Sequence, residues 1–392
     1  MIYKAFLNRQ EITGFPVKGK ETKEIWGGNT LLWRKEKRET LTVSGIHVYS
    51  LIFTNGSQTF AKIMFSDANG NAKDAIASFS TEKPCFTPLY ILDKPSYGER
   101  YLHTERFSAE ENGYMCVTET TAYTNEDRSH ELSLHITIRG FKSGSNFVSP
   151  TCVINAGENE YYSHTKIVWQ NHGYIYYYTS RYTGETRQWH QVIFKIDFNG
   201  TIVEKYETSS SNLSKILNIY ASYSTIYSGS RAFLIPMSQI YNICELKSNI
   251  FAPEKVSAPG EYVGRTNQKH IFIDFWSTGK KTCNIYKFVN GEFVKIRETE
   301  TNLRRLFTTV YNNHLIYYTL RENGIQVLDL GDLETGTDSD VKEISDILPA
   351  SSSMGAELTF AQNGYLYILY RNGAETANNI YLKTHRMFVI PL

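Results

Sequence analysis

Cysteine is scarce in this chain of 392 residues, and its spacing excludes two kinds of site. The five cysteines lie far apart and no Cys-x-x-Cys pair occurs, so the sequence encodes neither a zinc knuckle nor a dithiol redox motif. Cys116, Cys244 and Cys283 fall within strand-like apolar runs, where we expect reduced and buried thiols.

Charge of one sign and long apolar runs are also missing. The formal net charge is +1, which gives no electrostatic argument for binding nucleic acid or an anionic membrane. No stretch approaches the roughly 18 apolar residues of a membrane-spanning helix, and residues 1–10 contain no apolar signal-peptide core. We therefore expect a protein that is made in the cytoplasm and leaves the cell only by lysis.

The common catalytic motifs are absent as well. The sequence has no Gly-x-Ser-x-Gly turn, no phosphate-binding loop, no dinucleotide fingerprint and no His-Glu-x-x-His helix. Acidic residues are plentiful, but nothing in their spacing places two of them across a sugar, as a glycosidase requires. The sequence therefore predicts no catalytic residue, no metal, no cofactor and no enzymatic activity.

What the sequence does contain is a repeat. A glycine or polar pair followed by a short aromatic and β-branched run recurs at intervals of 68, 60, 57, 39, 44 and 51 residues. The seven copies are 45–53, 113–118, 173–178, 230–235, 269–274, 313–318 and 364–369. Asn-Gly, the strongest short hairpin signal, occurs eight times among them. This pattern predicts an all-β fold, a β-propeller of about seven blades.

Two regions follow from this pattern. Residues 1–40 predict a small module of two β-hairpins and a charged linker, and residues 41–392 predict the propeller. Because an open ring would leave an unpaired sheet edge, we expect residues 41–44 or the preceding linker to complete the last blade.

Aromatic side chains near polar ones are the candidates for ligand binding. The chain has 28 tyrosines, most of which we expect between blades, but one group around the third repeat combines flat rings with hydrogen-bonding groups. The candidate residues are Tyr161, Tyr162, Arg181, Tyr182, Trp189, His190 and Trp276. His47, His270 and His314 recur near the start of the repeated run, and we interpret them as core or channel-lining residues.

The opening segment resembles a known family. Residues 6–8, 11–15 and 25–33 are similar to the short N-terminal modules of phage and prophage tail appendage proteins from low-GC Gram-positive bacteria. The resemblance implies an attachment module on a tail or phage-tail-like bacteriocin (tailocin), with candidate anchors at Phe15, Trp26 and Trp33. It also implies other tail or baseplate subunits as partners, several copies per particle, assembly into a virion-like particle and release by lysis.

Together these observations predict a non-enzymatic virion component. Its propeller would bind a bacterial cell-surface polymer or protein, or would serve baseplate architecture. Several copies per particle would turn weak single contacts into high avidity. Two alternatives remain open: a propeller hydrolase or lyase acting on glycans, which needs converging carboxylates, and a cytoplasmic propeller scaffold unrelated to phage.

Overall fold

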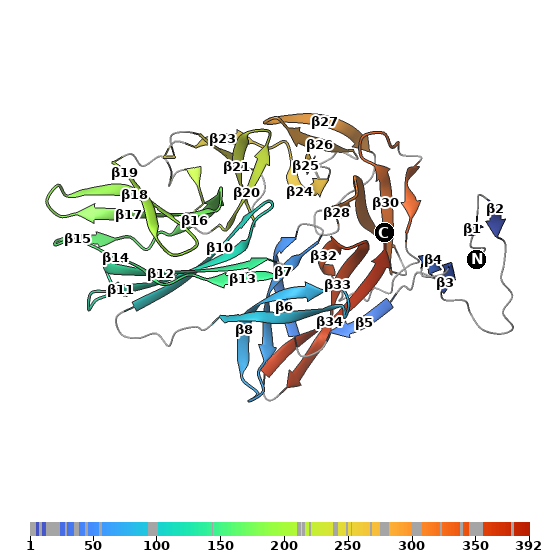
Figure 1. The fold of residues 1–392 in the computed structure, drawn as a ribbon, viewed down its shortest axis with the longest axis horizontal. Helices are drawn as coiled ribbons and strands as arrows, with labels where there is room; N and C mark the ends of the chain where they lie inside the picture. Colours follow the sequence, from blue (N-terminus) through green and yellow to red (C-terminus); the bar gives the residue numbers. More distant parts are fainter. Residues whose placement is uncertain are drawn as a thin grey trace.

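The computed structural model describes most of the propeller and five short strands before it (Figure 1). From residue 46 onward the described residues are continuous except for gaps at 55–56, 93–100, 143, 210–212, 214–215, 219–220, 238–241, 248–249, 252, 267–268, 275–281, 300–307, 322–323, 338–339, 345–355 and 378–379.

The described strands form antiparallel units that follow one another along the chain. The first unit contains β6 (Ile46–Thr54), β7 (Thr59–Ser66), β8 (Ala72–Ser80) and β9 (Cys85–Leu92). The next contains β10 (Tyr101–Glu110), β11 (Met115–Thr124), β12 (Glu131–Lys142), β13 (Ser145–Val148) and β14 (Cys152–Asn155). It is followed by β15 (Glu160–Tyr162), β16 (Ile167–Asn171), β17 (Tyr174–Thr183), β18 (Gln188–Ile196) and β19 (Ile202–Thr208).

Four further units have the same layout. They are β20 (Tyr223–Ser228), β21 (Arg231–Pro236), β22 (Asn242–Leu246) and β23 (Glu254–Ser257); then β24 (Glu261–Thr266), β25 (Lys269–Asp274), β26 (Cys283–Val289) and β27 (Glu292–Thr299). The last two are β28 (Thr308–Tyr311), β29 (His314–Arg321), β30 (Gly324–Asp332) and β31 (Lys342–Glu343); and β32 (Ala356–Gln362), β33 (Tyr365–Ala377) and β34 (Ile380–Pro391). The predicted fold class, an all-β propeller, is confirmed, and the number of blades in a closed ring stays a prediction.

The last unit takes its fourth strand from the other end of the chain. β5 (Glu39–Val43) pairs antiparallel with β34, with His385 opposite Val43 and Val389 opposite Glu39 (Figure 1). The expected pairing of the segment near residue 41 with the final unit is therefore confirmed. The two predicted N-terminal hairpins are also present, as β1 (Ala5–Leu7) with β2 (Gln10–Ile12) and β3 (Glu24–Gly27) with β4 (Thr30–Arg34).

Asn-Gly turns connect strands where the sequence predicts hairpins. Asn290 and Gly291, between β26 and β27, have φ values of 52° and 82°, and Asn363 and Gly364, between β32 and β33, have 50° and 84°. Two consecutive positive φ values define the type I′ turn, whose twist matches that of paired strands. Asparagine and glycine are the residues that tolerate this backbone.

Apolar cores lie between neighbouring units, as expected for a propeller. Trp169 of β16, for example, stacks on Tyr176 at 5.5 Å and packs in one cluster with Tyr223 of β20. Phe79 of β8 meets Phe360 of β32 edge-to-face at 4.9 Å. Many of the aromatic residues thus fill the spaces between units.

The cysteines predicted to be buried are buried. Cys116, Cys244 and Cys283 each have less than a tenth of their surface exposed, and all five cysteines are free thiols. Burial raises the pKa of Cys244 to about 11, so this thiol is protonated and unreactive near neutral pH.

The units are not all paired in the same way, because β10 of the second unit pairs directly with β20 of the fourth unit. Residues 108–110 run parallel to residues 223–225, which joins the second and fourth units into one sheet. Gln170 of β16 packs across this junction. Its fully buried side-chain amide donates to the carbonyl oxygens of Ser108 (2.8 Å) and Tyr114 (3.0 Å), and its backbone carbonyl oxygen accepts from Thr225 Oγ1. The β16–β19 strands therefore pack against the pairing of β10 with β20 through Gln170.

Replacing Gln170 by leucine is expected to destabilise the protein by about 2 kcal/mol, because two buried carbonyl oxygens lose a hydrogen bond. Gln170 Oε1 has no partner of its own, so its removal limits the cost. Thermal unfolding measures the effect, and Gln188→Leu, at an exposed position, is the matched control. Equal losses in both variants would contradict the assigned role of the Gln170 amide.

Candidate functional site

A central cavity of about 680 Å³ is lined by residues from six of the seven units. It is bordered by β6, the β10–β11 turn, β20, β24, β28 and β32, whereas the β16–β19 unit does not reach it. Its wall is formed by Leu51, Ile52, Phe53, Thr54, Ser57, Glu111, Asn112, Ser224, Ile226, Ile235, Pro236, Met237, Tyr262, Val263, Gly264, Arg265, Thr266, His270, Thr309, Val310, Tyr311, Asn312, Ala361 and Asn363. A volume of this size suits a drug-sized ligand or a short segment of a polymer.

A β-bulge in β24 shapes one wall of the cavity. Tyr262 pairs with Phe272 and Gly264 with Ile271, so Val263 has no opposite residue on β25. Gly264 has a φ of 151°, which favours glycine, and a Cβ there would lie 3.4 Å from Val310. Bulges of this kind redirect the side chains that follow them. Arg265, the next residue, stands opposite His270 and lines the cavity.

Glu111, Arg265 and His270 form a charged group on this wall. Arg265 Nη1 makes an ion pair with Glu111 Oε1, and His270 Nε2 lies 3.7 Å from the same oxygen. The other oxygen of Glu111 accepts from the backbone N–H of Tyr227 at 3.0 Å. Glu111 has 7% of its side chain exposed and Arg265 has 30%, so Arg265 is the member of the pair that solvent or a ligand reaches more readily.

His270 is held as a neutral ring. Burial, together with the neighbouring Arg265 cation, lowers its pKa to about 4, although the bond from Nε2 to Tyr227 O (3.3 Å) opposes this shift. With Nε2 donating to Tyr227 O, Nδ1 is free to accept from Tyr262 Oη at 3.4 Å. The interpretation of His270 as a channel-lining residue is confirmed; His47 is buried, and His314 is a partly exposed residue paired with Asp329.

Three of the predicted ligand-binding residues do come together, at the outer end of the β15–β17–β18 sheet. Tyr161 stacks on Tyr182 with centroids 4.9 Å apart, and Trp189 meets both rings at 5.5 Å. His130 packs edge-on against Tyr161 at 3.7 Å. Trp189 is 43% exposed, so this aromatic group faces solvent, and its three residues are not part of the wall of the central cavity.

The other three lie on the opposite face of the same sheet. Tyr162, Arg181 and His190 are directly opposite one another across the strands, one residue out of phase with the aromatic group. Tyr162 is buried in the core, and Arg181 binds Glu160 (2.7 Å) and Glu207 (2.5 Å). This set forms an internal ion-pair network and does not join the aromatic rings in one surface.

The remaining predicted residues are not placed. Trp276 and Phe15 lie outside the described residues. Trp26 and Trp33 belong to strands β3 and β4, but their side chains are not among those described.

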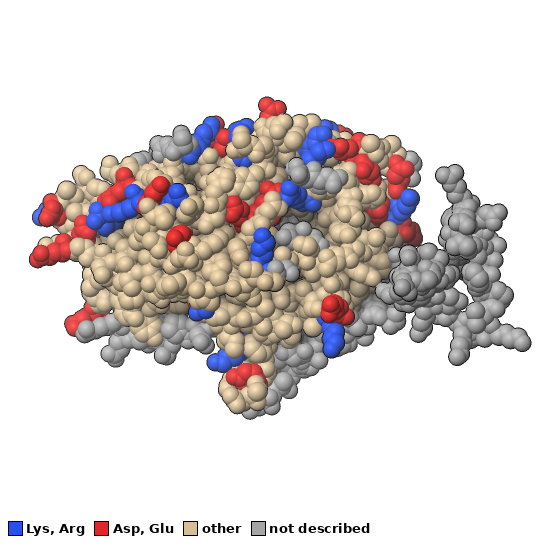
Figure 2. All heavy atoms as spheres, viewed as in Figure 1, with Lys and Arg blue, Asp and Glu red and all other residues tan. Residues whose placement is uncertain are grey.

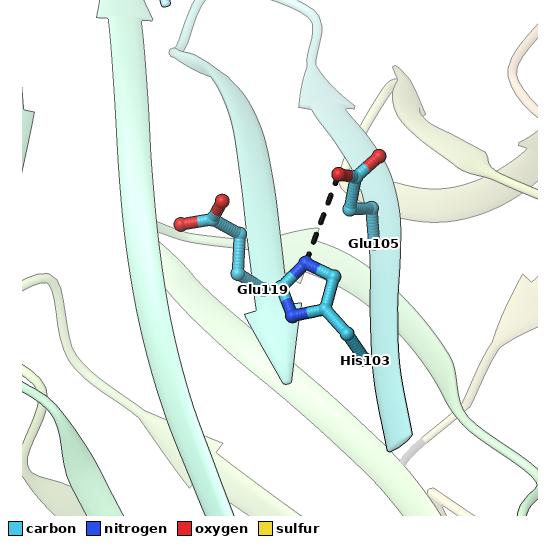
Figure 3. A group of neighbouring side chains, drawn as sticks. All are labelled: His103, Glu105 and Glu119. Atoms are coloured by element: carbon cyan, nitrogen blue, oxygen red, sulfur yellow. Dashed lines mark ion pairs between the residues drawn. The ribbon is translucent and has the colours of Figure 1, made fainter. Parts of the chain in front are cut away.

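One further group of potential metal ligands lies on β10 and β11 (Figure 3). His103 and Glu105 are two residues apart on β10 and share a face, and Glu119 of β11 is directly opposite Glu105. One ligand atom from each residue lies within 4.8 Å of the other two, and His103 Nε2 is 3.7 Å from Glu105 Oε1. Spacing along the sequence does not reveal this group, because only the strand register brings Glu119 beside the other two residues.

No family model and no curated protein matches the chain. Among solved structures, the acylaminoacyl peptidase of Pyrococcus horikoshii is 10% identical with a TM-score of 0.40, covering 88% of this chain and 51% of that one. The propeller domain of the Trilobed protease from Pyrococcus furiosus is 10% identical with a TM-score of 0.40, covering 88% and 93%. Prolyl oligopeptidase B from Galerina marginata is 11% identical with a TM-score of 0.35, covering 83% and 46%.

These similarities overturn the predicted role as a non-enzymatic virion component. Several chains of similar fold are peptidases, and others are a WD40 domain and a putative 6-phosphogluconolactonase. The prediction that the protein is not an enzyme is wrong by the same comparison. Both rested on about 35 residues ahead of the propeller and on missing motifs. The chain spans about half the length of the acylaminoacyl peptidases it matches, and at these identities the likeness concerns the fold alone.

Other predictions are untouched by these findings. The resemblance of the opening segment to tail modules, the tail, baseplate and cell-surface partners, and release by lysis stay predictions. Among the described residues, no helix is long and apolar enough to cross a membrane. On the face shown in Figure 2, acidic and basic side chains are interspersed, in keeping with a net charge of +1.

Proposed function

We propose that the central cavity binds a short peptide and holds its free carboxylate on Arg265. The observation that carries this proposal is an arginine on the cavity wall whose only partner among the described residues is Glu111. A guanidinium has five N–H donors in a planar fork, and a carboxylate accepts two of them side by side. The donors that Glu111 leaves unused are therefore suited to an anionic end group.

Strand edges around the cavity favour a peptide over other carboxylates. β6, β24, β28 and β32 are each the edge strand of their sheet, so one backbone edge of each is unpaired within the described sheets. An extended peptide can add its own N–H and C=O groups to such an edge, and its side chains then alternate between two environments.

Apolar residues on the cavity wall complete the site. Ile226, Ile235, Met237 and Val310 border the same cavity as Arg265. These residues offer contacts to apolar side chains of the peptide, which supply affinity while the carboxylate fixes orientation. We therefore expect a preference for short peptides with an apolar residue near a free C-terminus. Such binding fits either a hydrolase that holds a substrate or a scaffold that holds a partner segment.

The test is isothermal titration of the full chain with N-acetylated apolar tripeptides, each as the free acid and as the C-terminal amide. Free acids are expected to bind at least about tenfold more tightly, a difference of about 1.4 kcal/mol. Arg265→Lys keeps the charge beside Glu111 but loses the planar fork, so it is expected to remove most of this preference. Arg187→Gln, at an exposed turn, is the matched control.

Equal affinity for acids and amides, or an undiminished preference in Arg265→Lys, would contradict the proposal. Mass spectrometry of the same peptides after incubation separates binding from cleavage, because a hydrolase would release shorter products whereas a scaffold would leave the peptide intact.

A further inference from the structure

We propose that His103, Glu105 and Glu119 bind a divalent transition-metal ion, with Zn²⁺ the preferred ion among common cellular cations. The three side chains converge on one face of the β10–β11 hairpin, away from the central cavity (Figure 3). The site is independent of the proposed peptide binding.

An unpartnered nitrogen points into this group. His103 Nε2 is shielded from solvent and has no hydrogen-bond partner among the described residues, although it lies 3.7 Å from a carboxylate oxygen of Glu105. The other ring nitrogen, Nδ1, is 3.4 Å from Thr121 Oγ1 on the neighbouring strand. If Nδ1–H donates to this hydroxyl, the lone pair of Nε2 faces two carboxylates, and a cation between them satisfies all three groups.

Neighbouring residues hold Glu119 in place. Its Oε2 accepts from Arg139 Nε at 2.7 Å, and its Oε1 accepts from Tyr90 Oη at 2.5 Å. Arg139 also lies over the Tyr90 ring, 4.1 Å from its centroid. Each carboxylate oxygen keeps a second lone pair, so these contacts orient Glu119 and still leave it able to bind a metal. Two carboxylates and one arginine leave a net charge of −1, which favours a cation.

The ligand atoms of His103, Glu105 and Glu119, and the partial exposure of two of these side chains, indicate which ion would bind. One imidazole nitrogen with two carboxylate oxygens suits Zn²⁺ better than Mg²⁺, which prefers oxygen ligands alone. Ligand atoms around tetrahedral zinc are about 3.4 Å apart, so a small inward movement of the side chains closes the site. His103 and Glu105 keep 18% and 17% of their side-chain surface exposed, so an ion can enter and a water can complete its coordination.

The experiment is titration of EDTA-treated full-length protein with ZnCl₂, and separately with MgCl₂, followed by isothermal calorimetry. One Zn²⁺ per chain is expected, with much weaker Mg²⁺ binding, and His103→Gln and Glu105→Gln are each expected to lower the Zn²⁺ affinity at least tenfold. Glu185→Gln, an exposed carboxylate in the β17–β18 turn, is the matched control and should bind as the parent chain does.

Cobalt supplies a second readout. Co²⁺ added in place of Zn²⁺ is expected to give visible absorption bands of a nitrogen and oxygen site that His103→Gln abolishes, while circular dichroism confirms that the variant is folded. Absence of stoichiometric Zn²⁺ binding, or unchanged affinity and Co²⁺ bands in His103→Gln, would overturn the proposal and leave His103 as an ion-pair partner of Glu105.

Discussion

Replacing Lys166 by methionine is expected to destabilise the protein by about 3–5 kcal/mol, the usual cost of breaking a buried ion pair by removing one partner. Lys166 Nζ lies 2.6 Å from Glu131 Oε2, and the two side chains are 1% and 3% exposed. The ammonium also donates to the carbonyl oxygen of Ser163 and to Thr179 Oγ1. Methionine fills much of the same volume but leaves the Glu131 carboxylate buried, with His164, at 2.8 Å, as its remaining side-chain partner among the described residues.

Urea unfolding measures this loss, and two further variants make the result specific. Lys166→Met combined with Glu131→Leu should recover most of the stability, because a buried pair replaced as a whole by apolar groups costs little. Lys205→Met is the matched control: Lys205 also pairs with a glutamate, at 2.8 Å, but is 42% exposed, so its loss should cost less than about 1 kcal/mol. A similar loss for Lys166→Met and Lys205→Met would show that burial of the pair does not govern its contribution.

Strands and turns could be predicted because their signals are local. In five of the seven repeats the repeated run falls on the second strand of a unit, such as β25, and in the third repeat it falls on β17. These strands contain several buried apolar residues in succession, so they read as continuous apolar runs. In the first repeat it falls on β6, the first strand. The Asn-Gly pairs marked turns because few other residues adopt two positive φ values in succession.

The cavity could not be predicted, because many of its residues lie on strands that show neither a clear alternation of apolar and polar residues nor a long apolar run. β24 reads Glu-Tyr-Val-Gly-Arg-Thr and is interrupted by a bulge, so neither a two-residue period nor an apolar run marks it. Glu111 approaches Arg265 only because distant units meet around the axis. The position of histidine at the start of the repeated run was no guide to the cavity, because of His47, His270 and His314 only His270 lines it among the described residues.

The aromatic candidates divide into two sets for a reason that strand geometry explains. Tyr161, Tyr182 and Trp189 are opposite one another in register, so they meet on one face. Their sequence neighbours Arg181 and His190 must then point to the other face, because side chains alternate along a strand. Proximity in the sequence suggested one mixed surface, and alternation divided it into an exposed aromatic group and an internal ion-pair network.

Acidification should destabilise the protein by about 3 kcal/mol through His270 alone, between its unfolded pKa of 6.5 and its folded pKa of about 4. Below pH 6.5 the unfolded chain takes up a proton on this ring that the folded chain accepts only near pH 4. The stability that the neutral ring provides is therefore fully present above pH 6.5 and is lost as the pH falls through this window.

His270→Gln isolates this contribution, because glutamine can still donate to Tyr227 O but does not titrate. Urea unfolding at pH 7 and at pH 4 should give a smaller decrease for His270→Gln than for the parent chain, by about 3 kcal/mol. His314→Gln is the matched control, since His314 keeps 41% of its side chain exposed beside Asp329 and should leave the decrease nearly unchanged. An equal decrease in the parent chain and in His270→Gln would mean that the His270 ring takes up its proton as readily in the folded chain as in the unfolded chain. Glu111 would then act as the counter-ion of His270 and no longer of Arg265 alone. The same result would weaken the proposed peptide site, because a charged His270 would draw Glu111 from Arg265 and alter the donors that face the cavity.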